Sequence, residues 1–180
     1  MTSESSVRPA LELLSHWDPF HVPFIHRRIT TRGEFDQLLT KWTQRSYKLY
    51  PILYLAFHAS PGTLYIGDGR KTENVVSLDD LEGILDGKCH RRIIHLGGCD
   101  SIDLHGNRLN RFLDRTGALA VCGYCGDIDW LCSAVFEIIA FGAMQLNAFT
   151  KAGAKAILRK IEDDAGSLHQ QLNFRMVVRD

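Results

Sequence analysis

The sequence has no excess of charge of either sign, since 21 Lys and Arg residues are balanced by 21 Asp and Glu residues. This balance argues against a dedicated nucleic-acid binder, because such proteins usually carry a strongly basic face. No apolar run is long enough to span a bilayer, which requires about 20 residues. The longest apolar stretch, at residues 131–144, is interrupted by Ser133 and Glu137. We therefore expect neither nucleic acid nor a membrane among the partners.

Cysteine is scarce and irregularly spaced, with five residues that form no regular framework. The first residues, MTSESSVRPA, lack the basic region and apolar core of a signal peptide. Together these features predict a cytoplasmic protein with reduced thiols. The sequence contains no internal repeat and no low-complexity segment, and its 180 residues suit a single domain.

Short apolar runs alternate with longer amphipathic segments along the chain. Strands are predicted at residues 21–26, 51–57, 63–66, 92–96, 118–121 and 173–178, the last at a sheet edge. Helices are predicted at residues 33–47, 78–86, 107–115, 130–146 and 150–164. This alternation predicts an α/β protein, a three-layer αβα sandwich with a mostly parallel sheet. In such sheets, functional residues lie just beyond the carboxyl ends of the strands.

Two of these strand ends carry residues suited to nucleophilic catalysis. The strand at residues 51–57 runs directly into His58, and the strand at residues 92–96 runs into Gly97, Gly98 and Cys99. If the two strands are neighbours, about 4.8 Å apart, an imidazole and a thiol face each other across one crevice. An imidazole favours the nucleophilic thiolate and can protonate a leaving amine. The two glycines predict that a substrate backbone approaches this loop closely.

The order strand–His, hairpin, helix, strand–Gly-Cys, helix, strand resembles that of the caspase-like cysteine peptidases, which include caspases, metacaspases and the bacterial CHAT proteases. The resemblance extends from His21 to the last residue. The separation of His58 and Cys99 is similar to the roughly 50 residues typical of caspases. The local caspase motif around the cysteine is absent, so the resemblance is to the wider superfamily. It implies a caspase-like catalytic domain at residues 21–180, preceded by an N-terminal segment at residues 1–20.

The resemblance implies a cysteine endopeptidase that cuts a protein substrate and needs no cofactor and no metal. Cys99 would be the nucleophile, His58 the general acid/base, and the amides of Ala59 and Cys99 the oxyanion hole. The family usually has glycine after its histidine, and Ala59 at a positive φ would be strained by about 1–2 kcal/mol. This departure supports the alternative of a catalytically silent caspase-fold module that binds partners. The resemblance also allows an effector role in a stress or defence system, with a separate regulatory or sensor protein.

Substrate-binding residues are expected on two further segments. By the same resemblance, Asp127 and Trp130 belong to a loop that lines the substrate cleft, and Arg27 grips an acidic side chain. Asp129 stands where the following helix needs an N-cap, and Trp130 also suits a core position. Acidic residues favour Lys or Arg before the scissile bond, whereas Arg27 favours Asp or Glu. The preferred residue therefore stays open.

Cys122 and Cys125 form a CxxC motif, which occurs in redox and zinc sites. No second CxxC and no suitably spaced CxxH accompanies it, and a structural zinc ion needs four ligands. A redox or metal protein is therefore the weakest of the three hypotheses. His95 lies within an apolar strand and is expected to be a core residue.

Overall fold

A computed structural model of the chain describes residues 6–18, 21–67 and 72–180. Its main sheet has four strands in the order β1-β5-β6-β7. The strands β1 (Ile52–Leu55), β5 (Ile93–Leu96) and β6 (Ala120–Tyr124) run parallel to one another. The last strand, β7 (Phe174–Val178), runs antiparallel to β6 at the edge. The chain thus has a mixed α/β fold with a mostly parallel main sheet, as the sequence predicts.

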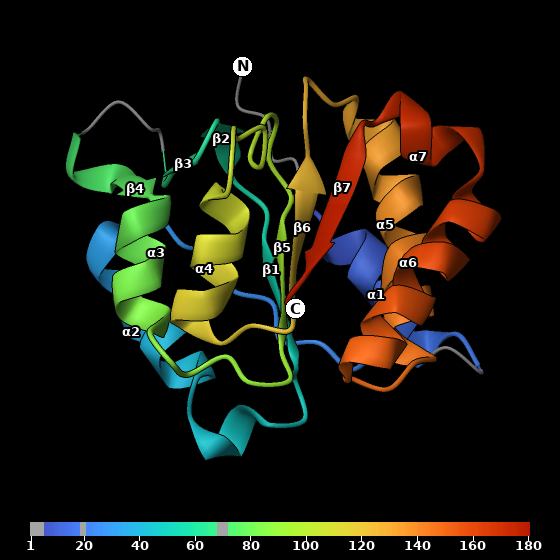
Figure 1. The fold of residues 1–180 in the computed structure, drawn as a ribbon, viewed down its shortest axis with the longest axis horizontal. Helices are drawn as coiled ribbons and strands as arrows, with labels where there is room; N and C mark the ends of the chain where they lie inside the picture. Colours follow the sequence, from blue (N-terminus) through green and yellow to red (C-terminus); the bar gives the residue numbers. More distant parts are fainter. Residues whose placement is uncertain (1–5, 19–20, 68–71) are drawn as a thin grey trace.

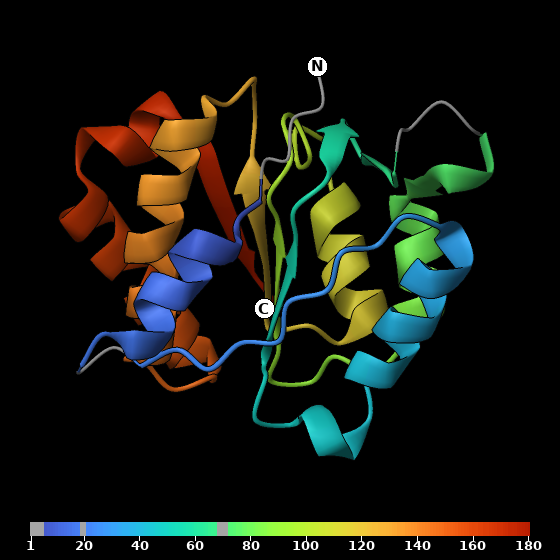
Figure 2. The same ribbon diagram turned by 180° about the vertical axis from the view of Figure 1, so that it is seen from behind.

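Helices cover both faces of this sheet (Figures 1 and 2). One face carries α2 (Arg32–Trp42), α3 (Leu78–Leu85) and α4 (Arg108–Thr116). The other carries α1 (Arg8–His16), α5 (Trp130–Gln145), α6 (Lys151–Ala165) and α7 (Ser167–Gln171). Each helix layer buries its own apolar core against the sheet. Among the described helices, none is both long and apolar enough to cross a membrane.

A smaller antiparallel sheet continues from the carboxyl end of β1. Its strands are β2 (His58–Ser60), β3 (Thr63–Tyr65) and β4 (Val75–Ser77). A turn at Pro61 and Gly62 joins β2 to β3, and Gly62 adopts a positive φ of 68° there. The strand predicted at residues 63–66 corresponds to β3, which pairs with β2 and β4 and not with β1. Leu64 and Val76 are buried in the α2–α4 layer and anchor this sheet.

Helix ends follow local sequence signals. Ser77 caps α3 in a reciprocal capping box with Asp80. Asp129 caps α5 by accepting a hydrogen bond from the Cys132 amide at 2.8 Å, so its predicted role as an N-cap is confirmed. The residue at which α5 begins is therefore fixed by its first turn.

The N-terminal region differs most from the prediction. Residues 21–26 form no strand: the Val22 amide donates to the Leu14 carbonyl at 3.1 Å, and Pro23 has no amide hydrogen to offer a sheet. Helix α1, which the sequence analysis did not predict, packs against α5 and buries Leu14. The segment at residues 1–20 therefore contributes a helix to the core.

Candidate active site

His58 and Cys99 follow two strands that lie side by side. In the parallel pairing of β1 with β5, Leu55 is the partner of Leu96. The Gly97 amide extends the ladder by donating to the Leu55 carbonyl at 3.0 Å. His58 and Cys99 each come three residues after this last pair. The prediction that they follow neighbouring parallel strands is confirmed.

The hairpin that carries His58 touches the loop that carries Cys99 at Gly98. A Cβ atom at Gly98 would overlap the Phe57 carbonyl oxygen and would lie 2.5 Å from the Ala59 Cβ. Neither neighbour can rotate away, because one is backbone and the other is fixed to it. A Cβ at Gly97 would likewise overlap the Tyr54 ring. Packing within the chain explains both glycines, and not the close approach of a substrate that the sequence suggested.

Both side chains of the pair are accessible. His58 is exposed and Cys99 is half-buried. Figure 1 shows the β2–β3 hairpin and the turn after β5 at the same edge of the molecule. Within the described ranges, no hydrogen bond joins the His58 imidazole to the Cys99 thiol. The loops are therefore brought together by backbone packing, and not by a hydrogen bond between the imidazole and the thiol.

Ala59 is not strained, since it is not among the described non-glycine residues with positive φ. It is the partner of Leu64, one pair further from the turn than Ser60 and Thr63. In a hairpin with a two-residue turn, the pair beside the turn is hydrogen-bonded and the next pair is not. The Ala59 amide therefore points away from β3. Its nitrogen lies 3.2 Å from the position of an ideal Cβ on Gly98.

The loop after β6 lies against the Cys99 loop. The Asp100 amide donates to the Gly126 carbonyl at 3.0 Å, and Asp100 adopts a positive φ of 52° that turns the chain sharply. Asp127 and Trp130 follow Gly126 and are both exposed, with 54% of the Trp130 surface accessible. The alternative that Trp130 is a core residue is therefore wrong. The structure brings this loop to the Cys99 loop.

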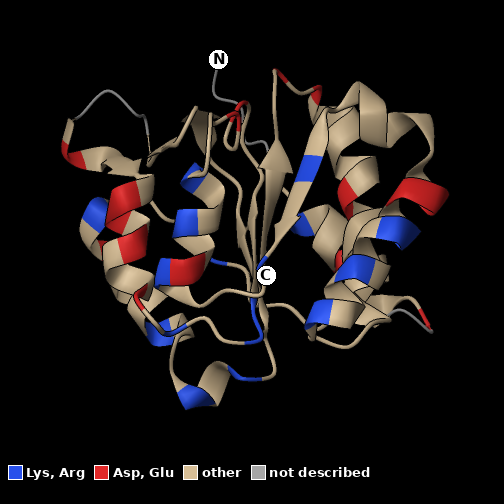
Figure 3. Ribbon diagram, viewed as in Figure 1, with Lys and Arg blue, Asp and Glu red and all other residues tan. Residues whose placement is uncertain are grey.

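The CxxC cysteines occupy different environments. Cys122 is buried and Cys125 is half-buried. Burial raises the pKa of the Cys125 thiol, the Asp103 carboxylate raises it further, and Arg175 opposes this. Figure 3 shows acidic residues in the loops at this edge of the sheet. In the part of the chain that the structure describes, no group of three or more His, Cys, Asp or Glu residues could hold a metal ion.

Arg27 is not brought to the two loops. Its guanidinium donates to the His26 carbonyl at 3.0 Å, and it lines a shallow hollow with Arg8 beside α1. Among the described residues, no hydrogen bond or ion pair links Arg27 to His58 or Cys99. The predicted substrate role of Arg27 has no support in this placement.

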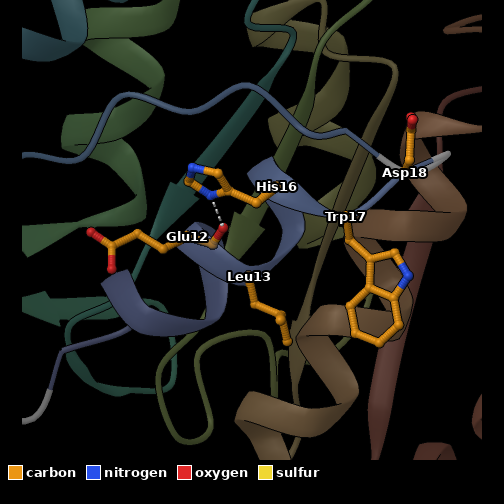
Figure 4. Close-up of a pocket in the computed structure, with 5 residues that line it drawn as sticks. All are labelled: Glu12, Leu13, His16, Trp17 and Asp18. Atoms are coloured by element: carbon orange, nitrogen blue, oxygen red, sulfur yellow. Dashed lines mark hydrogen bonds between the residues drawn. The ribbon is translucent and has the colours of Figure 1, made fainter.

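A larger open hollow of about 540 Å³ lies along the second half of α1. Figure 4 shows the residues that line it: Glu12, Leu13, His16, Trp17 and Asp18. The His16 imidazole is occupied by a 2.8 Å hydrogen bond to the Glu12 carbonyl. None of these residues is a cysteine or serine nucleophile. This hollow is separate from the strand ends that carry His58 and Cys99.

A buried polar cluster that the sequence analysis missed lies behind the Cys99 loop. Tyr54, His95 and Cys122 are cross-strand neighbours on β1, β5 and β6. Tyr54 Oη donates to Glu137 Oε2 at 2.5 Å, and His95 Nε2 lies 3.3 Å from Glu137 Oε1. Tyr124 Oη also donates to Glu137 Oε1, at 3.1 Å, and Cys122 Sγ lies 3.4 Å from His95 Nδ1. We call these five residues the Glu137 cluster.

The Glu137 cluster contains a Cys–His–Glu chain, but no substrate can reach it. His95 is 1% exposed, Glu137 is 3% exposed and Cys122 is fully buried. Burial lowers the pKa of His95, but the interactions with Cys122 and Glu137 raise it by a larger amount. The net result is a pKa raised to about 10. A charged His95 paired with Glu137 satisfies both groups inside the core. The cluster could have been inferred from the sequence, because Glu137 is an isolated charge in an apolar helix and a buried charge needs partners.

The fold and the paired strand ends define a mixed α/β protein with a candidate Cys–His site at its sheet edge. Residues 1–178 match the model of DUF6642, a family of unknown function, so the chain belongs to that family. No curated protein matches the sequence.

Proposed function

We propose that this protein is a cysteine endopeptidase with a caspase-like fold, in which Cys99 is the nucleophile and His58 the general acid/base. The observation that carries the proposal is the contact at Gly98. It joins two loops that leave adjacent parallel strands at matched positions. One loop carries an accessible imidazole and the other an accessible thiol. These are the two groups that covalent acyl transfer requires.

In the proposed reaction, the Cys99 thiol gives its proton to His58 and its sulfur attacks the scissile carbonyl carbon. The C–N bond then breaks, His58 protonates the leaving amine, and a thioester remains on Cys99. Water activated by His58 attacks the thioester carbonyl, which releases the acid and restores the thiol. Because no hydrogen bond joins the pair within the described residues, the side chains have to close together on the substrate, as catalytic contacts often do.

Two backbone amides are available for the oxyanion. The Ala59 amide points away from its hairpin partner strand. The Cys99 amide has no backbone acceptor among the described residues. Donors that are already oriented and unused are what an oxyanion hole needs. In this proposal, Asp127 and Trp130 contact the protein substrate from the adjoining loop.

The main alternative is a silent caspase-fold module that binds partners. Its support was the expected strain at Ala59, and the structure places Ala59 outside the positive-φ residues. The CxxC alternative is weakened because Cys122 is buried and burial raises the pKa of the Cys125 thiol. A thiolate, and not a thiol, is the reactive form.

The proposal is tested by proteolysis of a denatured protein mixture, with the new amino termini identified by mass spectrometry. Cys99→Ala and His58→Ala should each lower cleavage at least about 10³-fold without unfolding the protein, because the two groups act as one unit. Cys125→Ser should retain cleavage. Persistence of cleavage in Cys99→Ala would refute the proposal, and loss only in Cys125→Ser would favour the CxxC hypothesis. A folded wild-type protein that cuts nothing would favour the silent module.

A further inference from the structure

The loop that carries Cys99 packs against two other parts of the chain. On one side, Gly98 packs against Phe57 and Ala59 of the hairpin. On the other side, Gly97 packs beneath the Tyr54 ring, whose Cε2, Cζ and Oη atoms are the nearest neighbours of its ideal Cβ. The two glycines thus lie between two surfaces immediately before Cys99. The position of the thiol depends on both surfaces.

The Tyr54 ring is itself held by the Glu137 cluster. Its hydroxyl makes the shortest hydrogen bond that Glu137 receives, at 2.5 Å, compared with 3.1 Å from Tyr124. The ring also packs against His95, with 5.1 Å between the ring centroids, and against Phe141 at the same distance. A phenol with its ring packed and its hydroxyl bonded to a buried carboxylate has little rotational freedom. Gly97 therefore rests on a rigid surface.

We infer that Tyr54 and Glu137 are positioning residues for Cys99: the carboxylate fixes the phenol, and the phenol fixes the loop that presents the thiol to His58. This inference rests on the proposed function, because it assigns Cys99 and His58 as the reacting pair. Neither Tyr54 nor Glu137 touches the substrate in it. Their contribution is to keep the sulfur at a fixed distance from the imidazole, and an error of about 1 Å in such an alignment costs up to about 10²-fold in rate.

Tyr124 provides a matched control for Tyr54. Both hydroxyls donate to the Glu137 carboxylate, and both rings pack against His95. The three atoms nearest to an ideal Cβ on Gly97 all belong to the Tyr54 ring. Tyr54→Phe and Tyr124→Phe therefore each remove one hydrogen bond from the same buried carboxylate. A purely structural role predicts similar consequences for both, whereas positioning predicts a consequence at Cys99 for Tyr54 alone.

The test measures alkylation of Cys99 by iodoacetamide in the full chain, resolved by peptide mass spectrometry. We define the dyad factor as the rate of Cys99 alkylation with His58 present, divided by the rate in the same protein carrying His58→Ala. We expect a dyad factor of at least about 10 in the otherwise unchanged protein. Tyr54→Phe and Glu137→Gln should lower it to below about 3, and Tyr124→Phe should leave it unchanged. Cys122, which is fully buried, reports any general loosening of the core by becoming alkylated.

A second variant changes the loop side of the contact between Gly97 and the Tyr54 ring. Gly97→Ala should lower the dyad factor because its methyl group overlaps the Tyr54 ring. Combined with Tyr54→Leu, it should cause little further loss, since two changes at one contact are not additive. This variant keeps the test decisive if Tyr54→Phe loosens the core.

The outcomes separate the two claims. A dyad factor near 1 in the otherwise unchanged protein overturns the Cys99–His58 pair, and with it the positioning role. A large dyad factor that Tyr54→Phe and Gly97→Ala leave unchanged overturns positioning alone. Equal losses in Tyr54→Phe and Tyr124→Phe, with Cys122 alkylated in both, also overturn positioning, because they show a general effect on the core. A loss confined to Tyr54, Glu137 and Gly97 variants supports it.

Discussion

Adding one methyl group at Gly98 should force apart the two loops that carry His58 and Cys99. The added Cβ would overlap the Phe57 carbonyl oxygen and would lie 2.5 Å from the Ala59 Cβ. Neither atom belongs to a flexible side chain, so the backbone of one loop has to move. Overpacking of this kind costs about 1–3 kcal/mol. For a chain of this size, each kcal/mol lowers the unfolding temperature by about 2–4 °C, so Gly98→Ala should lower it by about 2–12 °C.

The matched control is Gly83→Ala. Gly83 is an exposed residue of α3, and nothing lies within 4 Å of its ideal Cβ. Alanine is favoured over glycine in a helix by about 1 kcal/mol, so this variant should be as stable as the parent or more stable. Opposite signs for the two substitutions would show that the loss at Gly98 comes from its neighbours and not from the exchange of glycine for alanine.

Thermal unfolding followed by circular dichroism measures the stability, and the rate of Cys99 alkylation reports a displacement of the loop that carries Cys99. Gly98→Ala should change both, and Ala59→Gly in the same protein should restore part of the stability by removing one of the two obstructions. An unfolding temperature equal to that of the parent, together with an unchanged Cys99 alkylation rate, would refute the close contact between the loops. The structural basis of the proposed function would then be lost.

Two further predictions concern pH and the residue after His58. The His95 pKa is raised to about 10, so the folded protein holds a proton that the unfolded chain releases above about pH 6.5. The free energy of unfolding, measured with urea, should therefore fall between about pH 6.5 and 10. Burial also raises the pKa of Tyr54, so the fall should continue above pH 10; stability that rises over this range would contradict the assignment. Ala59→Gly should change peptide cleavage less than about threefold, because Ala59 needs no positive φ. A large gain in rate would show that the methyl group displaces the oxyanion donor.

Most of the fold could be predicted from local patterns. The apolar runs before His58 and Cys99 contain β1 and β5, and the N-cap expected at Asp129 marks the start of α5. The parallel pairing of β1 with β5 could also be predicted, because short strands that alternate with helices usually form a parallel sheet. These features depend on residues close together in the sequence, which is why a single sequence reveals them.

The errors arise where distant residues decide the structure. Residues 21–26 have an apolar, strand-like pattern, but the Val22 amide bonds to α1 and no strand forms. The use of Gly97 and Gly98 for packing could not be foreseen, because Tyr54 and Ala59 approach them from other strands. The Glu137 cluster was missed for the same reason, as its members come from three strands and one helix.

The Glu137 cluster also has a consequence for how the strands align during folding. β5 is buried on both faces, with Ile93 in one apolar layer and Ile94 in the other. Apolar residues alone therefore discriminate poorly against a pairing shifted by one position, which would exchange the two faces. A shifted β5 would turn His95 away from Glu137 and bury an unpaired imidazole, at a cost of roughly 1–3 kcal/mol. One polar side chain in an otherwise apolar strand thus selects a single alignment of β1, β5 and β6, and that alignment sets Cys99 level with His58.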